Sequence, residues 1–363
     1  KLSGVRIMAY TTIDDPSAHF QIALWTGSSG TDTITFDGNS DLQLDFLWTK
    51  CRSNGHSNAL MDTSRITSGD YLPLFADTTD VEQTFYDSEL QSILSDGFTV
   101  GTQPHAGGDG KTYVGFAWKA NGGTTSSDSN GSITSTVQAN TTAGFSIITY
   151  TGTGSAATLG HGLGSAPEVV IAKSRSQAYG WIVYHKEAAS DAHTDYLGLD
   201  DTDALIDFPM WNDTAPTSTV FSVGTDVAVN NNTKNYVAYC FSQKQGYSKF
   251  GSYTGNGNAD GPFVYTGFKP AWIMLKRTDS ANNWHINDSV RDIDNPVIEY
   301  LYADTTAGDD NLSGGGGLDF LSNGFKIRST TAAVVNADGG TYIYIAFAKH
   351  PFVSSEGVPV TAR

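Results

Sequence analysis

Hydrophobic residues fall in short runs that alternate with polar residues, and turn-forming residues separate these runs. Runs such as 112–119 and 235–241 are rich in Tyr, Val and Phe, which favour strands. Gly, Asn and Asp between the runs tolerate the positive φ angles of tight turns. The pattern therefore predicts an all-β protein with helix limited to short turns. One segment could form a helix instead, because Phe85, Leu90 and Leu94 within 84–94 could line one helical face.

Five sequence blocks recur in the same order three times. An aromatic residue before Thr-Gly lies at 25–30, 150–154 and 253–257, and an apolar run ending in Lys or Arg lies at 42–52, 167–175 and 270–277. The other three lie at 71–79, 196–202 and 300–306, at 96–101, 220–224 and 323–327, and at 112–119, 235–241 and 341–349. We interpret the apolar run as a buried strand that emerges into solvent at its basic end. The closing strand is expected to be central in its sheet.

The spacing of the copies predicts the domain organisation. A unit of about 100 residues with several short strands suits a β-sandwich. We expect three tandem jelly-roll-like β-sandwich repeats: repeat 1 with an N-terminal extension at 1–120, repeat 2 at 143–246, and repeat 3 with a C-terminal tail at 247–363. Residues 121–142 are rich in Gly, Ser and Thr and are expected to form a flexible or extended linker, which would leave repeat 1 the most independent.

Composition narrows the functional classes. The net charge is −17 and no cluster of Lys and Arg is present, which argues against nucleic-acid binding, because that function needs a basic face. No apolar run approaches the ~18 residues of a membrane span. Cys51 and Cys240 lie at different positions of their repeats, so we expect two buried free thiols rather than a disulfide.

Several segments carry a resemblance to a known group of proteins. They are 150–154 with 161–164 and Pro167, and 211–221, 247–257, 260–272 and 320–325. These segments resemble an uncharacterised tandem-repeat domain of marine bacteriophage tail and tail-fibre structural proteins. The resemblance covers 145–352 and, more weakly, 20–119. It implies a structural role and supplies no catalytic residues.

The sequence contains no motif to which we assign a catalytic, cofactor-binding or metal-binding residue. His161-Gly-Leu-Gly is interpreted as a turn, because no Gly-x-Ser-x-Gly is present. Gly314–Gly317 is interpreted as a flexible hairpin rather than a phosphate loop. The histidines, such as His19, His56, His105 and His185, show no zinc spacing.

Two features remain open as binding sites. Carboxylates cluster at Asp200, Asp201 and Asp203, at Asp309 and Asp310, and at Asp37 and Asp41; they are either solvated turn residues or Ca²⁺ ligands, and no other cofactor is expected. Trp181 and Trp284 fall at equivalent positions, where repeat 1 has Ala59 or Leu60. They are either core residues or loop aromatics that stack on sugars.

Three functional hypotheses follow. The first is a non-enzymatic virion structural protein, a tail or tail-fibre subunit in a symmetric oligomer that acts in assembly or attachment to host-surface glycans. The second is a subunit of an extracellular fibre or surface layer of a cell. The third is a secreted array of carbohydrate-binding modules. All three place the chain on a virion or outside a cell. The stretches 5–10 and 358–360 are expected either to be disordered or to pair with strand edges of neighbouring subunits.

Overall fold

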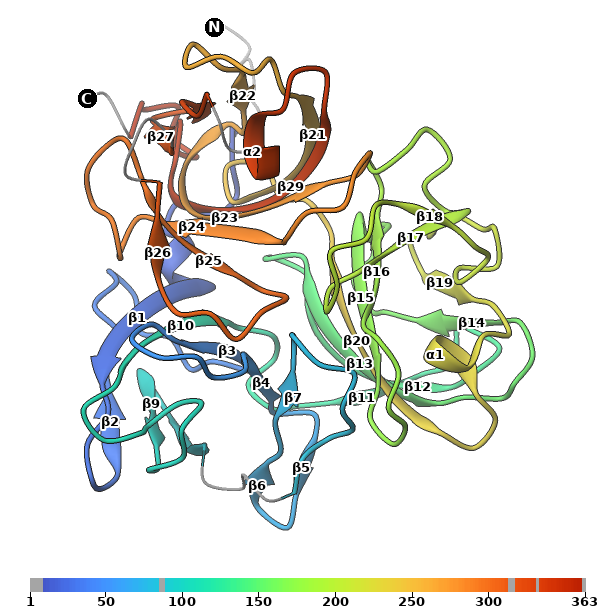
Figure 1. Ribbon diagram of the computed structural model, residues 1–363. Coiled ribbons are helices and arrows are strands. Elements are labelled where there is room, and N and C mark those ends of the chain that lie inside the picture. The colour runs from blue at the N-terminus through green and yellow to red at the C-terminus, as the bar shows by residue number, and fades with distance from the viewer. Residues whose placement is uncertain (1–8, 85–88, 313–316, 331–332, 361–363) are drawn as a thin grey trace, which may run out of the picture.

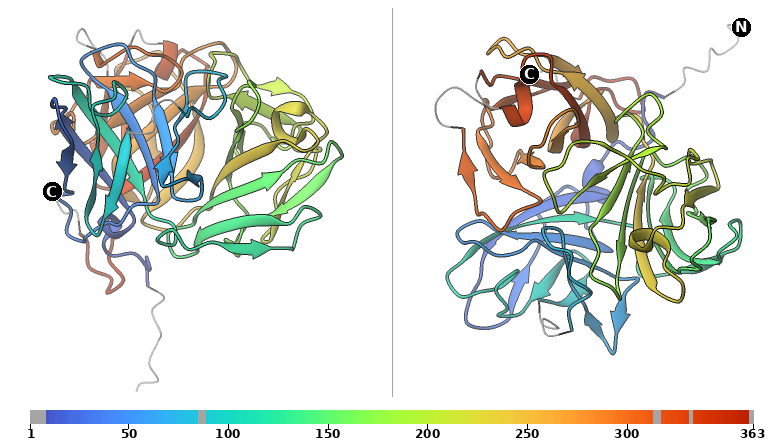
Figure 2. Two further views of the ribbon diagram at one scale, coloured as in Figure 1. Left: turned by 90° about the horizontal axis from the view of Figure 1, so that it is seen from below. Right: turned by 45° about the vertical axis from the view of Figure 1, so that its right-hand side comes forward.

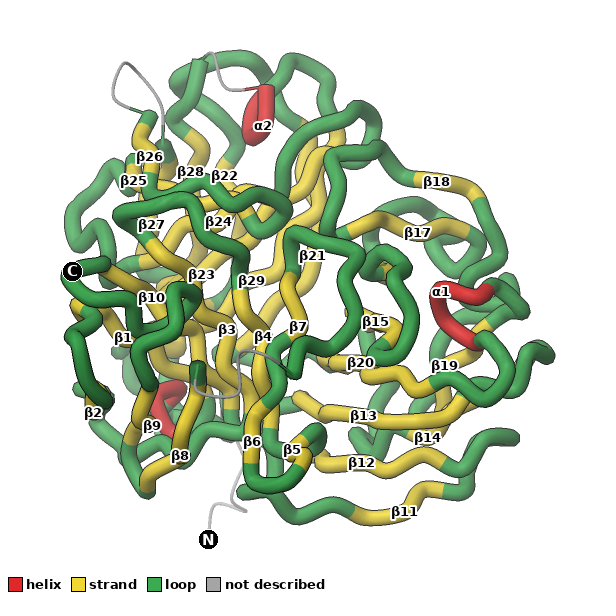
Figure 3. The backbone as a smooth tube through the Cα atoms, turned by 60° about the horizontal axis from the view of Figure 1, so that its bottom comes forward, coloured by secondary structure: helices red, strands yellow, loops and turns green. Residues whose placement is uncertain are grey.

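The computed structural model describes residues 9–84, 89–312, 317–330 and 333–360, and these form an all-β protein. The helical elements among them are the 3₁₀ turn η1 (Pro16–Ala18) and the single turns α1 (Val227–Asn230) and α2 (Ala333–Asn336) (Figure 3). The predicted fold class is confirmed. The helix considered for 84–94 is wrong where the segment is described, because Leu90–Leu94 is strand β8; Phe85 lies outside the described residues.

The strands form three units that surround a common centre (Figure 1). Unit 1, drawn in blue and teal, consists of β1 (Phe20–Thr26), β2 (Asp32–Ile34), β3 (Phe46–Cys51), β4 (Ala59–Asp62), β5 (Ile66–Thr67), β6 (Asp70–Tyr71), β7 (Leu74–Phe75), β8, β9 (Gly97–Val100) and β10 (Thr112–Trp118).

Unit 2, in green and yellow, consists of β11 (Ser126–Asp128), β12 (Ser135–Asn140), β13 (Phe145–Thr151), β14 (Ala157–Gly160), β15 (Val169–Ser174), β16 (Ile182–His185), β17 (Asp195–Gly198), β18 (Ile206–Asp207), β19 (Val220–Val223) and β20 (Asn235–Phe241). Unit 3, in orange and red, consists of β21 (Ser248–Thr254), β22 (Phe263–Tyr265), β23 (Phe268–Arg277), β24 (His285–Asp288), β25 (Glu299–Tyr302), β26 (Asp310–Asn311), β27 (Leu318–Leu321), β28 (Gly324–Ile327) and β29 (Thr341–Pro351).

The main sheets of the three units share one strand order. It runs β1-β10-β3-β4-β7 in unit 1, β13-β20-β15-β16-β17 in unit 2 and β21-β29-β23-β24-β25 in unit 3. The closing strands β10, β20 and β29 are therefore central, as the sequence predicts. A smaller sheet accompanies each main sheet, in the orders β2-β9-β8, β14-β19 and β22-β28-β27.

The pairing of first and last strands explains two of the recurring sequence blocks. Their aromatic residues lie opposite each other and stack, with ring centroids 5.5 Å apart for Trp25 and Tyr113, 5.1 Å for Tyr150 and Tyr236, and 4.9 Å for Tyr253 and Tyr342. The Gly after each Thr is needed for space, since a Cβ atom on Gly27, Gly152 or Gly255 would lie 2.3–2.4 Å from a carbonyl oxygen.

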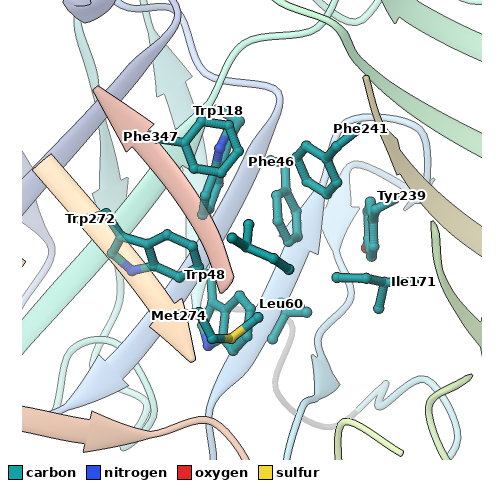
Figure 4. Close-up of a pocket in the computed structure, with 11 residues that line it drawn as sticks. Phe46, Trp48, Leu60, Trp118, Ile171, Tyr239, Phe241, Trp272, Met274 and Phe347 are labelled. Carbon is teal, nitrogen blue, oxygen red and sulfur yellow. The ribbon is translucent and has the colours of Figure 1, made fainter. Parts of the chain in front are cut away.

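The inner faces of the three main sheets meet in one hydrophobic core. Three equivalent aromatic residues of the closing strands, Trp118, Phe241 and Phe347, contact one another edge to face, with centroids 5.5–6.4 Å apart (Figure 4). Around them, Phe46 of unit 1 stacks on Tyr239 of unit 2 at 4.4 Å. The cavity left among these side chains is only about 20 Å³ and its lining is apolar, so it is packing space and not a ligand site.

This shared core changes the expected domain organisation. The units lie side by side around the centre in the right-hand view of Figure 2, and the first unit contacts the third as well as the second. Each unit also has a hydrophobic cluster of its own, but a unit taken alone would expose its share of the common core. We therefore describe one fold of three units that share a core.

The expected linker at 121–142 is wrong. Residues 126–128 and 135–140 form β11 and β12, which extend the main sheet of unit 2 beyond β13. The turn before them is held on both sides: Asp45 of unit 1 accepts hydrogen bonds from the backbone N–H groups of Ala120, Gly122 and Gly123, and Gln138 of β12 accepts two more. Thr and Ser suit an exposed edge strand as well as they suit a linker, so composition could not separate the two.

The described parts of both ends fold back onto their own chain. Ile13 belongs to the shared core, Thr11 donates a hydrogen bond to Gln245 O, and the Tyr10 hydroxyl donates one to Gly267 O. Near the other end, Val360 N donates to Phe352 O and closes a short hairpin. Tyr10 and 358–360 thus contact their own chain, and their pairing with a neighbouring subunit stays a prediction; residues 5–8 lie outside the described residues.

The shared core predicts the behaviour of an isolated unit. A fragment of residues 1–120 loses the partners of Phe46, Trp48 and Trp118, so it should aggregate or lack fixed aromatic packing. Size-exclusion chromatography with light scattering and near-ultraviolet circular dichroism check this against the full chain. A monomeric fragment with a sharp aromatic spectrum would contradict the shared core.

Candidate functional site

Each unit buries one lysine where it meets another unit. Lys50, Lys173 and Lys276 are the next-to-last residues of the equivalent strands β3, β15 and β23 and are at most 1% exposed. Lys50 Nζ donates to Thr305 O of unit 3 at 2.5 Å, Lys173 Nζ to Thr79 O of unit 1 at 2.9 Å, and Lys276 Nζ to Thr202 O of unit 2 at 2.9 Å. Each unit thus binds the next in a closed cycle, which we call the lysine cycle.

The expectation that these basic residues emerge into solvent is wrong. Burial lowers the pKa of each ammonium to about 8, and a nearby carboxylate opposes this shift: Asp77 for Lys50, Asp200 for Lys173 and Asp304 for Lys276. Burial also raises the pKa values of Asp200 and Asp304 to about 6. The sequence did contain a signal for this shared role, because Lys recurs at one position of all three repeats.

Trp181 and Trp284 are fully buried at the same interfaces between units, which we call joins. The indole N–H of Trp181 donates to Phe75 O of unit 1 at 2.7 Å, and that of Trp284 donates to Gly198 O of unit 2 at 2.6 Å. Their equivalent in unit 1 is Asn58, not Ala59 or Leu60, and its amide reaches Ala303 O of unit 3 at 3.0 Å. The backbone N–H of each residue donates to the equivalent Asp77, Asp200 or Asp304. Of the two alternatives for Trp181 and Trp284, the structure therefore shows core residues and not loop aromatics that stack on sugars.

Two of the three joins carry a second set of charges. Between units 1 and 2, Glu82 bridges Arg65 at 2.6 Å and Arg175 at 2.8 Å. Between units 3 and 1, Asp309 bridges Arg291 at 2.9 Å and Arg52 at 2.5 Å. The inner arginines Arg65 and Arg291 also pair with carboxylates three residues earlier, Asp62 and Asp288.

The join between units 2 and 3 replaces this set with uncharged residues. Leu205 stands where the others have Glu82 and Asp309, since all three donate a backbone hydrogen bond to an equivalent strand end, Leu205 to Thr278 O. Ala188 and Thr278 replace the two arginines. At the position of Asp62 and Asp288 is His185, whose Nε2 donates to Tyr344 O at 3.1 Å and whose pKa burial lowers to about 4. The whole set is exchanged, so no buried charge is left without a partner.

The acidic clusters mostly face cations of the chain itself. Next to Asp200 and Asp201, the carbonyl oxygens of Thr202 and Asp203 accept hydrogen bonds from Lys276 Nζ. Asp309 binds Arg52 and Arg291, and Asp310 accepts from the Tyr300 hydroxyl. Asp37 and Asp41 are exposed. Among the described residues no three His, Cys, Asp or Glu side chains form a group that could hold a metal ion.

The remaining sequence features have structural roles where they are described. His161 is buried in a loop, its Nε2 donating to Thr217 O and its Nδ1 accepting from Leu163 N, so neither nitrogen is available as a base. His105 pairs with the buried Glu89 at 2.6 Å. Cys51 and Cys240 are buried free thiols, as predicted. Of the Gly314–Gly317 segment, 314–316 lie outside the described residues.

A cleft on unit 2 was not anticipated from the sequence. Its volume is about 390 Å³, within the range of small-ligand sites. It lies beside the start of β15 and the end of β16, and its lining residues with polar or aromatic side chains are Glu168, Tyr184, Lys186, Glu187, Ser190 and His193. We call it the unit 2 cleft.

Comparison with known families matches residues 15–351 to a family described as a domain of unknown function (DUF7483). The chain belongs to this family. The match begins at the N-cap of η1 and ends at the last residue of β29, so it takes in all three units together. No curated protein matches the sequence. No described helix is long and apolar enough to cross a membrane.

The lysine cycle predicts a graded series of stability losses. Replacing Lys276, Lys173 or Lys50 by Met leaves three, two or one carbonyl oxygens without their ammonium donor. At about 1–3 kcal/mol for each unsatisfied group, the free energy of unfolding should fall most for Lys276→Met and least for Lys50→Met. Urea unfolding measures the order, with the half-buried Lys234→Met as control. Equal, near-zero losses would show that the ammonium groups do not hold the joins.

The two kinds of join predict a rescue by concerted substitution. Glu82→Leu alone leaves Arg65 and Arg175 without a shared acid and should cost about 3–5 kcal/mol. Adding Asp62→His, Arg65→Ala and Arg175→Thr copies the join of units 2 and 3 and should recover part of that loss. Urea unfolding of both variants checks this. A fourfold variant less stable than Glu82→Leu would show that the two kinds of join are not equivalent.

Proposed function

We propose that the chain is a non-enzymatic structural protein of a virion, a tail or tail-fibre subunit that acts in assembly or host-surface attachment. The observation that carries the proposal is the use of the buried charged and aromatic residues. Lys50, Lys173 and Lys276, the two bridging acids and both interface tryptophans all connect one unit to another. The use of these buried residues as contacts between units favours a rigid module over a reaction centre.

Two further features support the proposal. The sequence blocks resemble those of marine bacteriophage tail and tail-fibre proteins, and they coincide with the strands that build the three units. The net charge of −17 favours solubility at the high local concentration of a repeating assembly. Burial of Trp181 and Trp284 removes the feature that favoured an array of carbohydrate-binding modules.

Immunogold electron microscopy tests the location. Antibodies raised against the purified chain should label purified virus particles, with gold at the tail, and pre-incubation of the antibody with the chain should abolish the label. Gold on filaments or on the surface of uninfected cells would contradict the virion proposal and favour an extracellular fibre or surface layer. Absence of label from both would contradict each of these structural roles.

A further inference from the structure

The unit 2 cleft corresponds to a place in unit 1 that the chain fills with its own backbone. Glu168 and Asp45 occupy equivalent positions: Glu168 N donates to Phe241 O and Asp45 N to Trp118 O, both at 2.8 Å. On the other side, Lys186 N donates to Glu168 O as Thr63 N donates to Asp45 O. Both residues precede the central apolar strand of their sheets, β15 and β3.

The carboxylate of Asp45 shows what this position binds. It accepts hydrogen bonds from Ala120 N at 2.7 Å, Gly122 N at 2.9 Å, Gly123 N at 2.7 Å and the Thr63 hydroxyl at 2.9 Å. Gly122 and Gly123 have φ angles of +62° and +76°, which point successive N–H groups toward one anion. A glycine-containing turn is therefore the ligand of the carboxylate in unit 1.

In unit 2 the equivalent carboxylate has no such turn. The chain leaves β20 and turns at Lys244–Tyr247 toward unit 3 instead. Within the described residues no hydrogen-bond donor reaches the carboxylate of Glu168, and its nearest cation, Lys186 Nζ, is 3.9 Å away. The side chain of Glu168 is only 22% exposed, and burial raises its pKa. The charge is thus partly removed from water without replacement donors, an arrangement that a ligand would relieve.

The third equivalent position is Ala271, whose carbonyl accepts from Ser289 N as those of Asp45 and Glu168 accept from Thr63 and Lys186. It has no carboxylate, and the space beside it is a groove of about 90 Å³. Only unit 2 combines the acid with an open cleft of about 390 Å³. Glu187 adds a second carboxylate and Lys186 one ammonium, so the cleft favours a ligand with N–H donors over an anion.

We propose that the unit 2 cleft binds a glycine-containing peptide turn of another polypeptide chain, which presents successive backbone N–H groups to Glu168. The turn at 120–123 is the internal counterpart of this ligand. The inference extends the assembly role in the proposed function by naming a contact surface and the chemistry of its partner. Its test uses the purified chain alone, so a negative result leaves the immunogold result unaffected, and the reverse also holds.

The probe is a trifluoroacetyl-capped, amidated peptide with the sequence of residues 120–124, Ala-Asn-Gly-Gly-Thr, observed by ¹⁹F NMR during titration with the chain. Saturable broadening at millimolar concentration or below is expected. Glu168→Gln should weaken binding at least tenfold, since the charge-assisted hydrogen bonds are lost, and Glu168→Ala should abolish it. The control is Asp213→Asn, an exposed acid outside the cleft with the same change of charge as Glu168→Gln.

A second peptide isolates the role of the N–H groups. N-methylglycine in place of the first glycine removes one donor, so this peptide should bind at least tenfold more weakly. The proposal is overturned if the first peptide fails to bind, if it binds Glu168→Ala as well as the unchanged chain, or if both peptides bind equally. Saturable binding of glucosamine without binding of the peptide also overturns it, because the cleft then takes an amino sugar.

Discussion

The fold depends on the contact of Trp118, Phe241 and Phe347 at the centre of the molecule. Each is the last of the Phe, Tyr and Trp residues in its closing strand, and each packs edge to face on the other two. Aromatic pairs of this kind contribute about 0.5–1.5 kcal/mol beyond the area they bury. Because three separate units must supply one ring each, the contact exists only when all three sheets are in place. The stability of each unit is therefore linked to that of the others.

The joins around this centre are built from one plan with local exchanges. The lysine, the aspartate beside it and the Trp or Asn donor occur in all three units, and every donor reaches a backbone carbonyl of another unit. The outer charges are exchanged as a set: Arg65, Glu82 and Arg175 in one join correspond to Ala188, Leu205 and Thr278 in another. This is the expected result where a single exchange would leave a buried charge unpaired.

Sequence patterning was sufficient for the fold class and for the central place of β10, β20 and β29, because strand period and aromatic content are local properties. It failed where the burial or pairing of a residue depends on partners that are distant in the sequence. Lys50, Lys173 and Lys276 look like strand ends leaving the core, and their carbonyl partners lie far away in the chain. Residues 126–140 have the composition of a linker, and only their pairing with β13 shows that they are sheet. The ligand that we propose for the unit 2 cleft follows from the equivalence of Glu168 and Asp45, which only the structure shows.

Differential scanning calorimetry of the full chain tests the central claim most directly, since it measures whether the three units unfold as one. If they share a core, the chain should show a single endotherm whose calorimetric enthalpy equals its van't Hoff enthalpy. Separate endotherms, or a calorimetric enthalpy about three times the van't Hoff value, would show that the units unfold independently and would contradict the account.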